Sequence, residues 1–181
     1  MRRFISISFL LAFTFIAQSQ VFNTSTTLRP GKFSVGIEPV IYVPNNDFSL
    51  FMHGGVGLAK SIDFGAKLGV FRNDVYIGGD IEFSLARFFS LSFGAHSHGN
   101  FALDGTALFT FPLGKPANLY TGLDSDVVFI KNPKDDVRFP LWIPLGLEVK
   151  VKRGIAFLFE AEIAANDPAE HMIGGGFNFF F

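Results

Sequence analysis

The chain ends on the stretch Ile173-Gly174-Gly175-Gly176-Phe177-Asn178-Phe179-Phe180-Phe181. Successive side chains of a β-strand point to opposite faces, so Ile173, Phe177, Phe179 and Phe181 share one apolar face. The glycines and Asn178 alternate with them or separate them. This period of two predicts a strand over 171–181.

The same alternation recurs along most of the chain after Pro30. In the clearest run, 137–151, every second residue is apolar. This run is longer than the usual globular strand of about five or six residues and suits a tilted strand that crosses a membrane. Pro140 and Pro144 lack a ladder donor, so we expect a bulge or a frayed stretch there. About ten strands are expected, at 32–43, 49–60, 63–71, 75–85, 88–96, 101–111, 119–130, 137–151, 155–163 and 171–181.

Short turns join the predicted strands. Asn73-Asp74 and Gly99-Asn100 are turn signals, and Gly154 is placed for the left-handed position of a three-residue hairpin loop. No connection is long enough to hold a helix, which excludes βα units. We therefore expect an all-β fold, a transmembrane antiparallel up-and-down β-barrel of about 8 to 10 strands. Eight strands would result if poorer segments, 49–60 above all, merge or lie outside the barrel.

The beginning of the chain has the pattern of an export signal. Two arginines precede an apolar stretch, Phe4 to Ile16, which ends in the small residues of Ala17-Gln18-Ser19. This pattern predicts three segments, which are a signal peptide at 1–19, an N-terminal periplasmic lead-in at 20–31 and the transmembrane barrel at 32–181.

Composition agrees with a membrane protein and excludes other classes. The chain has 25 Phe residues, and a barrel whose outer solvent is lipid needs such an apolar surface. It has no Cys, which excludes disulfides and thiolate chemistry. The net charge of −1 gives no attraction to nucleic acid, so nucleic acid is not an expected partner.

The export signal, the alternating strands and the C-terminal stretch resemble the small outer-membrane β-barrel families of the OmpA and OmpX type. The resemblance covers nearly the whole mature chain in pattern, but only the last strand in motif. It implies a barrel without a periplasmic domain, located in the cell outer membrane and exported through a cleaved signal peptide. It also implies that outer-membrane lipid and the barrel-assembly machinery are partners. The assembly signal presented to that machinery would be Phe181, Phe179, Phe177 and Ile173.

When such a barrel closes, the polar residues that alternate with the apolar ones along each strand face its interior. Charges in this narrow space must pair and hydrogen-bond, which predicts a rigid, plugged interior. Carboxylates outnumber the basic residues there, and that excess would favour cations. Trp142 and the three tyrosines have the same parity, so either they fill the interior or the parity changes locally. The expected interior charges are Glu38, Lys67, Asp80, Glu82, His96, Asp124, Asp126, Arg138, Glu148, Lys150, Glu160 and Glu162.

Several functions fit this pattern. We expect an outer-membrane barrel of structural or surface role, and the first alternative is a narrow cation-preferring channel. A second alternative is a lipid-active hydrolase using His96 or His98, although Ser97 alternates to the opposite face. A soluble periplasmic barrel with an apolar interior is the alternative at the level of fold. We expect no enzyme, and the sequence gives no catalytic residue, metal site or cofactor; the ligand is unknown.

Overall fold

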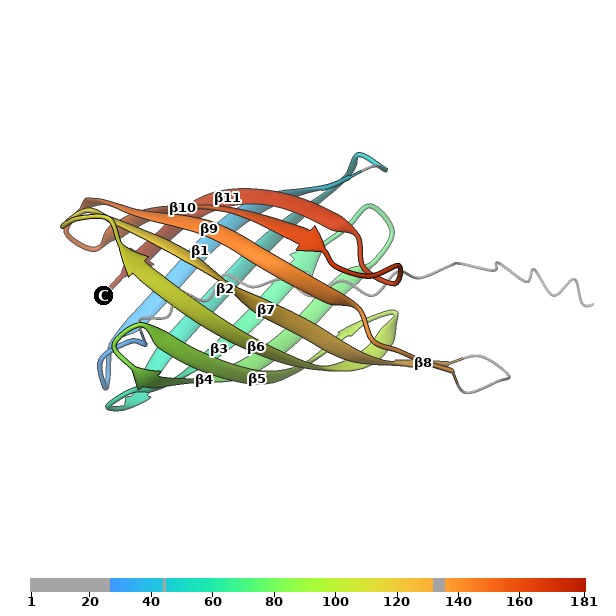
Figure 1. Ribbon diagram of the computed structural model, residues 1–181, viewed down its shortest axis with the longest axis horizontal. Coiled ribbons are helices and arrows are strands. Elements are labelled where there is room, and N and C mark those ends of the chain that lie inside the picture. The colour runs from blue at the N-terminus through green and yellow to red at the C-terminus, as the bar shows by residue number, and fades with distance from the viewer. Residues whose placement is uncertain (1–26, 44, 132–135) are drawn as a thin grey trace, which may run out of the picture.

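The computed structural model describes residues 27–43, 45–131 and 136–181 (Figure 1). The predicted signal peptide, 1–19, and the first part of the lead-in lie outside the described residues. Within the described ranges, no helix has the length and apolar character needed to cross a membrane.

In the described part of the chain, ten antiparallel strands form the wall of a closed barrel, and a short eleventh strand extends one hairpin. Each wall strand pairs with the next along the chain, and β1 pairs with β11 to close the barrel. The short strand β8 pairs with β7 beyond the wall and projects from one end (Figure 1). The strands are β1 (Phe33–Val43), β2 (Asp47–Ala59), β3 (Ile62–Val70), β4 (Val75–Ala86), β5 (Phe89–His98), β6 (Asn100–Pro112), β7 (Ala117–Ile130), β8 (Asp136–Arg138), β9 (Leu141–Lys152), β10 (Ile155–Ala164) and β11 (His171–Phe180).

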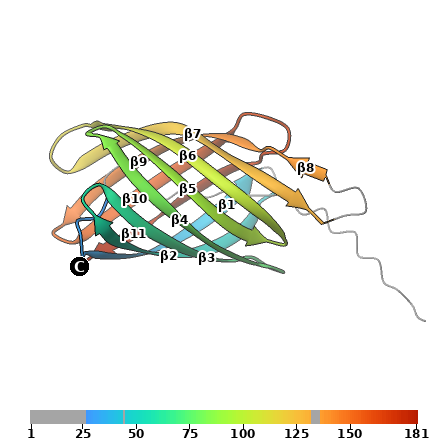
Figure 2. The same ribbon diagram turned by 90° about the horizontal axis from the view of Figure 1, so that it is seen from below.

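The wall has two distinct ends. At one of them β1 begins and β11 ends, and the Phe181 amide donates to the Phe33 carbonyl over 2.9 Å. We call this the terminus end; it also carries the turns after β2, β4, β6 and β9. The opposite loop end carries the connections after β1, β3, β5, β7 and β10. Between the two ends the strands run obliquely to the long axis (Figure 2), as barrel closure requires.

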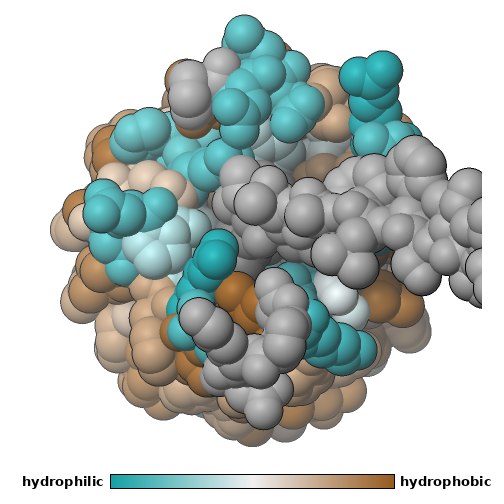
Figure 3. Space-filling model, turned by 90° about the vertical axis from the view of Figure 1, so that its right-hand side faces the viewer, coloured by the Kyte–Doolittle hydropathy of each residue, from teal (hydrophilic) through white to brown (hydrophobic). Residues whose placement is uncertain are grey.

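Side chains alternate across the wall as the period of two predicts. In β1 every odd-numbered residue is exposed and every even-numbered residue is buried. Phe33 is 55% exposed on the outside, whereas Glu38 and Tyr42 are buried inside. Seen from the loop end, hydrophilic residues gather at that end and apolar residues cover the flanks (Figure 3). This is the reverse of a soluble barrel with an apolar interior, so that alternative is wrong.

The structure settles the strand number at ten wall strands and corrects one boundary. The segment 49–60 forms part of β2, a full member of the wall, so the eight-strand alternative is wrong. The expected strand 137–151 breaks between β8 and β9 at Phe139 and Pro140. The carbonyl of Pro140 still accepts from the Asp126 amide over 3.2 Å, so the chain continues along β7 after the break. Gly154 has φ of 77°, which confirms its predicted left-handed position.

Candidate functional site

The interior of the barrel is the candidate site, and it begins at the loop end with an aromatic layer. Alternate positions of five strands turn large apolar side chains inward, and these side chains pack together. The indole of Trp142 is fully buried and donates from Nε1 to the backbone oxygen of Glu170 over 2.8 Å. Phe51 packs edge-on to Tyr76, with ring centroids 5.3 Å apart. The layer consists of Val40, Tyr42, Phe51, Tyr76, Trp142 and Met172.

Trp142 and all three tyrosines therefore fill the interior, as one of the two sequence-based alternatives proposed. Tyr42, Tyr120 and Trp142 have no exposed surface, and Tyr76 has 3%. The hydroxyl of Tyr42 accepts a hydrogen bond from the Ser49 hydroxyl over 3.3 Å. Buried tyrosine and tryptophan need such partners for their polar ends.

Next to the aromatic layer, His96 is held between two carboxylates. Its Nδ1 lies 3.3 Å from Asp104 Oδ2, and its Nε2 lies 3.5 Å from Asp126 Oδ2. Its ring stacks on Tyr76 at a centroid distance of 4.9 Å. Since β4, β5, β6 and β7 each supply one of these residues, the cluster connects four neighbouring strands.

The middle of the barrel is rich in carboxylates. Asp124 has no exposed surface and accepts a hydrogen bond from the Thr106 hydroxyl over 2.5 Å. Glu160 is likewise buried and adjoins Tyr120 and Glu162. Buried carboxylates cost several kcal/mol unless they are hydrogen-bonded, paired or neutralised by a proton. The many acids of this layer therefore need hydrogen bonds, a cation or a proton to be stable there.

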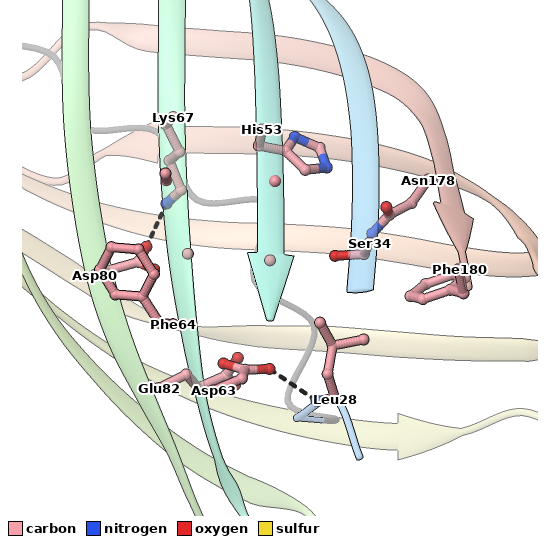
Figure 4. A pocket seen from close by; sticks show the side chains of 14 residues that line it. Leu28, Ser34, His53, Asp63, Phe64, Lys67, Asp80, Glu82, Asn178 and Phe180 are labelled. Atoms are coloured by element: carbon pink, nitrogen blue, oxygen red, sulfur yellow. Dashed lines mark hydrogen bonds and ion pairs between the residues drawn. The ribbon is translucent and has the colours of Figure 1, made fainter. Parts of the chain in front are cut away.

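Toward the terminus end the interior contains a small cavity of about 50 Å³ (Figure 4). Lys67 Nζ forms an ion pair with Asp80 Oδ2 over 2.8 Å at its edge, and both side chains are largely buried. Asp63 Oδ2 accepts from the Leu28 amide over 2.8 Å, which ties the lead-in to the barrel mouth. A cavity of this size has room for a few water molecules and is too small for a larger solute.

The predicted interior charges separate into two groups. Eight carboxylates of the described residues are at most 5% exposed, and they are Glu38, Asp80, Glu82, Asp124, Asp126, Glu148, Glu160 and Glu162. Lys67 lies among them, with a side chain 11% exposed. Arg138 and Lys150 are exposed, so their placement in the interior cluster is corrected. Each has interior parity but lies too close to an end of the wall to be enclosed.

Asp104 is an interior carboxylate that the sequence reading missed. Its side chain is 13% exposed and contacts His96. Its signal was present in β6, where Ala102, Asp104 and Thr106 alternate with outward-facing residues such as Leu103. Gly105 interrupts the apolar face beside it and weakens the pattern.

The remaining histidine of the His96-Ser97-His98 motif stands apart from His96. His98 Nε2 lies 3.6 Å from Asp74 Oδ2, and its ring stacks on Phe71 at 4.1 Å. Ser97 is exposed on the outer face of β5, so it does not meet either histidine ring from within the barrel. The described residues contain no group of three or more His, Cys, Asp or Glu side chains that could hold a metal ion.

The four residues of the predicted assembly signal lie together on the outer face of β11 and at its end. Ile173 is 44%, Phe177 45%, Phe179 38% and Phe181 68% exposed. Their role in assembly stays a prediction. Their position on the lipid-facing side of the strand that closes the barrel is consistent with it.

No protein-family model matches the chain, and no curated protein matches it either. Similar solved structures include the translocator domain of the autotransporter NalP from Neisseria meningitidis, with 10% identity, a TM-score of 0.51, and coverage of 83% of this chain and 88% of that one. The Yersinia pestis outer membrane protein Ail has 10% identity and a TM-score of 0.45, over 83% of this chain and 99% of Ail. The N-terminal barrel domain of Pseudomonas aeruginosa OprF has 14% identity and a TM-score of 0.38, over 84% of this chain and 98% of the OprF domain.

The likeness to NalP is one of fold alone, and it agrees with the closed barrel described above. An outer wall of Phe, Leu, Ile and Val around a charged interior suits lipid outside and not water. In hydrocarbon only a closed barrel satisfies every strand edge. The protein is thus a small integral β-barrel of the outer membrane, as the resemblance in sequence predicted.

Proposed function

We propose that this protein is a non-conducting outer-membrane barrel of structural or surface role, whose charged interior is largely plugged. The observation that carries the proposal is the aromatic layer at the loop end. Its six members come from β1, β2, β4, β9 and β11 and pack across the barrel interior. Phe71, Ala164 and Ala169 pack against them from the loop end.

Toward the middle of the barrel, an ion pair and a hydrogen bond link neighbouring strands on the interior face. Lys67 on β3 pairs with Asp80 on β4, and Thr106 on β6 bonds Asp124 on β7. Contacts of this kind hold neighbouring strands in register and leave little room for solute. No catalytic role is part of the proposal.

The second candidate, a narrow cation-preferring channel, is favoured by a different observation. Among the described residues, Lys67 is the one Lys or Arg that is not exposed, while eight carboxylates are buried. Acidic rings and linings favour cations in narrow pores. For current to pass, the aromatic layer would have to move aside.

Conductance in planar bilayers tests the first proposal against the second. The refolded protein is first shown to have closed by its heat-modifiable gel mobility, and then added to the bilayer at neutral pH. The absence of current from a closed barrel is the expected result. Discrete cation-selective steps that disappear in the Asp124→Asn, Asp126→Asn variant would instead establish the channel and refute the plugged barrel.

A further inference from the structure

The terminus end of the barrel carries a one-sided charge. The exposed acidic side chains of the described residues, Asp47, Asp136 and Asp167, all lie at the loop end, where three exposed basic residues balance them. The terminus end has no such balance. Its turns and rim present eight exposed basic side chains in the described ranges: Arg29, Lys32, Lys60, Arg87, Lys115, Lys150, Lys152 and Arg153.

These basic residues lie where the apolar outer wall ends. Lys32 precedes Phe33, which is 55% exposed, and Lys152 follows Val151, which is 61% exposed. The guanidinium carbon of Arg87 lies 5.1 Å from the ring centroid of Phe88. Long basic side chains at the edge of an apolar wall extend their charges to the level of lipid headgroups. The basic rim is therefore placed at the boundary between hydrocarbon and water.

On one side of the rim the basic residues surround a cleft of about 740 Å³. The lead-in contributes Arg29 and Lys32, while β9 and its turn contribute Lys150, Lys152 and Arg153. Within the described part of the chain, none of these five side chains forms an ion pair with an acidic side chain. The cleft thus offers several uncompensated positive charges to one ligand.

The acid that lines this cleft is already engaged. Glu148 is 3% exposed, and its Oε2 accepts from Asn118 Nδ2 over 2.7 Å. Apart from Thr27 and Gly154, the rest of the lining is apolar and includes Ile155 and Phe181. Both residues face outward, and Phe181 is 68% exposed, so the cleft borders the lipid-facing wall on this side, while Glu148 and Phe180 line it from the interior side.

We propose that this cleft binds the headgroup of an anionic phospholipid. The headgroup phosphate lies among Lys32, Lys150, Lys152 and Arg153, and the acyl chains follow the outer wall beside Ile155 and Phe181. Charge complementarity supports the anionic headgroup, because basic clusters at membrane surfaces attract anionic lipids. The apolar wall of the cleft favours a lipid over a free anion. The inference assumes the outer-membrane location and does not depend on whether the barrel conducts.

Native mass spectrometry of the refolded protein in a neutral detergent tests the proposal. The protein is titrated with phosphatidylglycerol and, separately, with zwitterionic phosphatidylcholine of the same chains. We expect retained adducts with phosphatidylglycerol at concentrations where phosphatidylcholine gives none. Equal retention of both lipids would overturn the proposal.

Two variants with the same change of charge locate the site. The cleft variant is Lys150→Gln, Lys152→Gln, Arg153→Gln, and its control at the loop end is Arg72→Gln, Lys131→Gln, Arg138→Gln. Each basic residue near an anionic surface contributes about five-fold in affinity, so the cleft variant, which loses three of them, should bind phosphatidylglycerol about one hundred-fold more weakly. Loss of the same size in the control variant, or none in the cleft variant, would contradict the assignment.

Two further measurements separate the remaining explanations. A variant that keeps the charge, Lys150→Arg with Lys152→Arg, should retain binding, and heat-modifiable mobility checks that every variant has closed. Inorganic phosphate at millimolar concentration should leave the lipid adducts in place. Displacement of the lipid by inorganic phosphate would identify a free-anion site and refute the lipid proposal.

Discussion

The seam that closes the barrel should be sensitive to a single methyl group at Gly176. This residue lies on β11 next to β1, where Pro39 interrupts the ladder between the pairs Ile37–Phe177 and Val40–Gly174. Proline has no amide hydrogen, so the seam already lacks a donor at this point. A Cβ on Gly176 would lie 2.0 Å from the carbonyl oxygen of Ile37 and 3.0 Å from the Cα of Glu38.

The cost of Gly176→Ala follows from these distances. Carbon and oxygen atoms in close contact lie about 3.3–3.6 Å apart, so the two backbones must separate by more than about 1 Å. Overpacking of this kind costs about 1–3 kcal/mol, and each seam hydrogen bond that is lost costs about 1 kcal/mol more. We expect the free energy of unfolding to fall by about 2–4 kcal/mol.

Gly105→Ala is the matched control for this substitution. Gly105 lies in the middle of β6, and a Cβ there would meet Phe93 at an ordinary 3.7 Å. The control should change stability by no more than about 0.5 kcal/mol. Both variants lack other changes in charge or polarity, so their difference reports the contact at the seam.

Urea titration of the barrel refolded into phosphatidylcholine vesicles measures both variants. The chain has one tryptophan, and Trp142 lies in the barrel interior, so its fluorescence reports unfolding directly. Gly176→Ala should unfold at a clearly lower urea concentration than Gly105→Ala. If the two midpoints agree, the backbone at the seam yields without cost and the reasoning from the Ile37 carbonyl is wrong.

Three other predictions concern the ion pair, a turn and the last residue. Lys67→Met leaves the buried carboxylate of Asp80 without its cation and should lower the free energy of unfolding by about 3–5 kcal/mol. Adding Asp80→Leu should recover most of that loss. Equal urea midpoints for the single and double variants would exclude the effect. Ser61 has φ of 70°, a conformation that costs a residue with Cβ about 1–2 kcal/mol. Ser61→Gly should therefore raise the urea midpoint of unfolding. A lower midpoint would show that the Ser61 side chain contributes more than the backbone strain. Phe181→Ser should slow insertion by purified barrel-assembly machinery, while Phe111→Ser, at another exposed outer position, should not; equal rates would remove Phe181 from the assembly signal.

The sequence was sufficient for the wall of the barrel because each side chain there has only two possible directions. In β1 the alternation of Val35 and Ile37 with Glu38 and Tyr42 gave the correct face for every residue. The same rule placed Trp142 inside, against the usual position of tryptophan at membrane interfaces. The alternating direction of side chains is a property of the strand backbone, and it outweighs the usual location of a single residue type.

Parity failed where the strand itself ended. Arg138 and Lys150 have interior parity, yet Arg138 belongs to the projecting β8, and Lys150 lies at the rim of the terminus end. Parity gives a direction but no height along the barrel axis, and only the register between strands supplies that height. The same gap concealed the cleft at the rim, because Lys32 and Lys152 are far apart in sequence and meet only through closure.

The aromatic layer and the acidic layer relate the two candidate functions to one another. Trp142 on β9 pairs directly with Asp124 on β7, and Tyr42 on β1 pairs with Met172, which also pairs with Glu162, so the aromatic layer adjoins the buried acids. If the layer is what prevents conduction, Trp142→Gly with Tyr42→Ala should open a path lined by Asp124 and Glu160 and should pass cations in preference to anions. Phe101→Gly with Phe109→Ala, two changes on the outer wall, should leave the bilayer silent, provided that all barrels show heat-modifiable mobility. A silent barrel after removal of Trp142 and Tyr42 would mean that the ionic contacts alone block the interior.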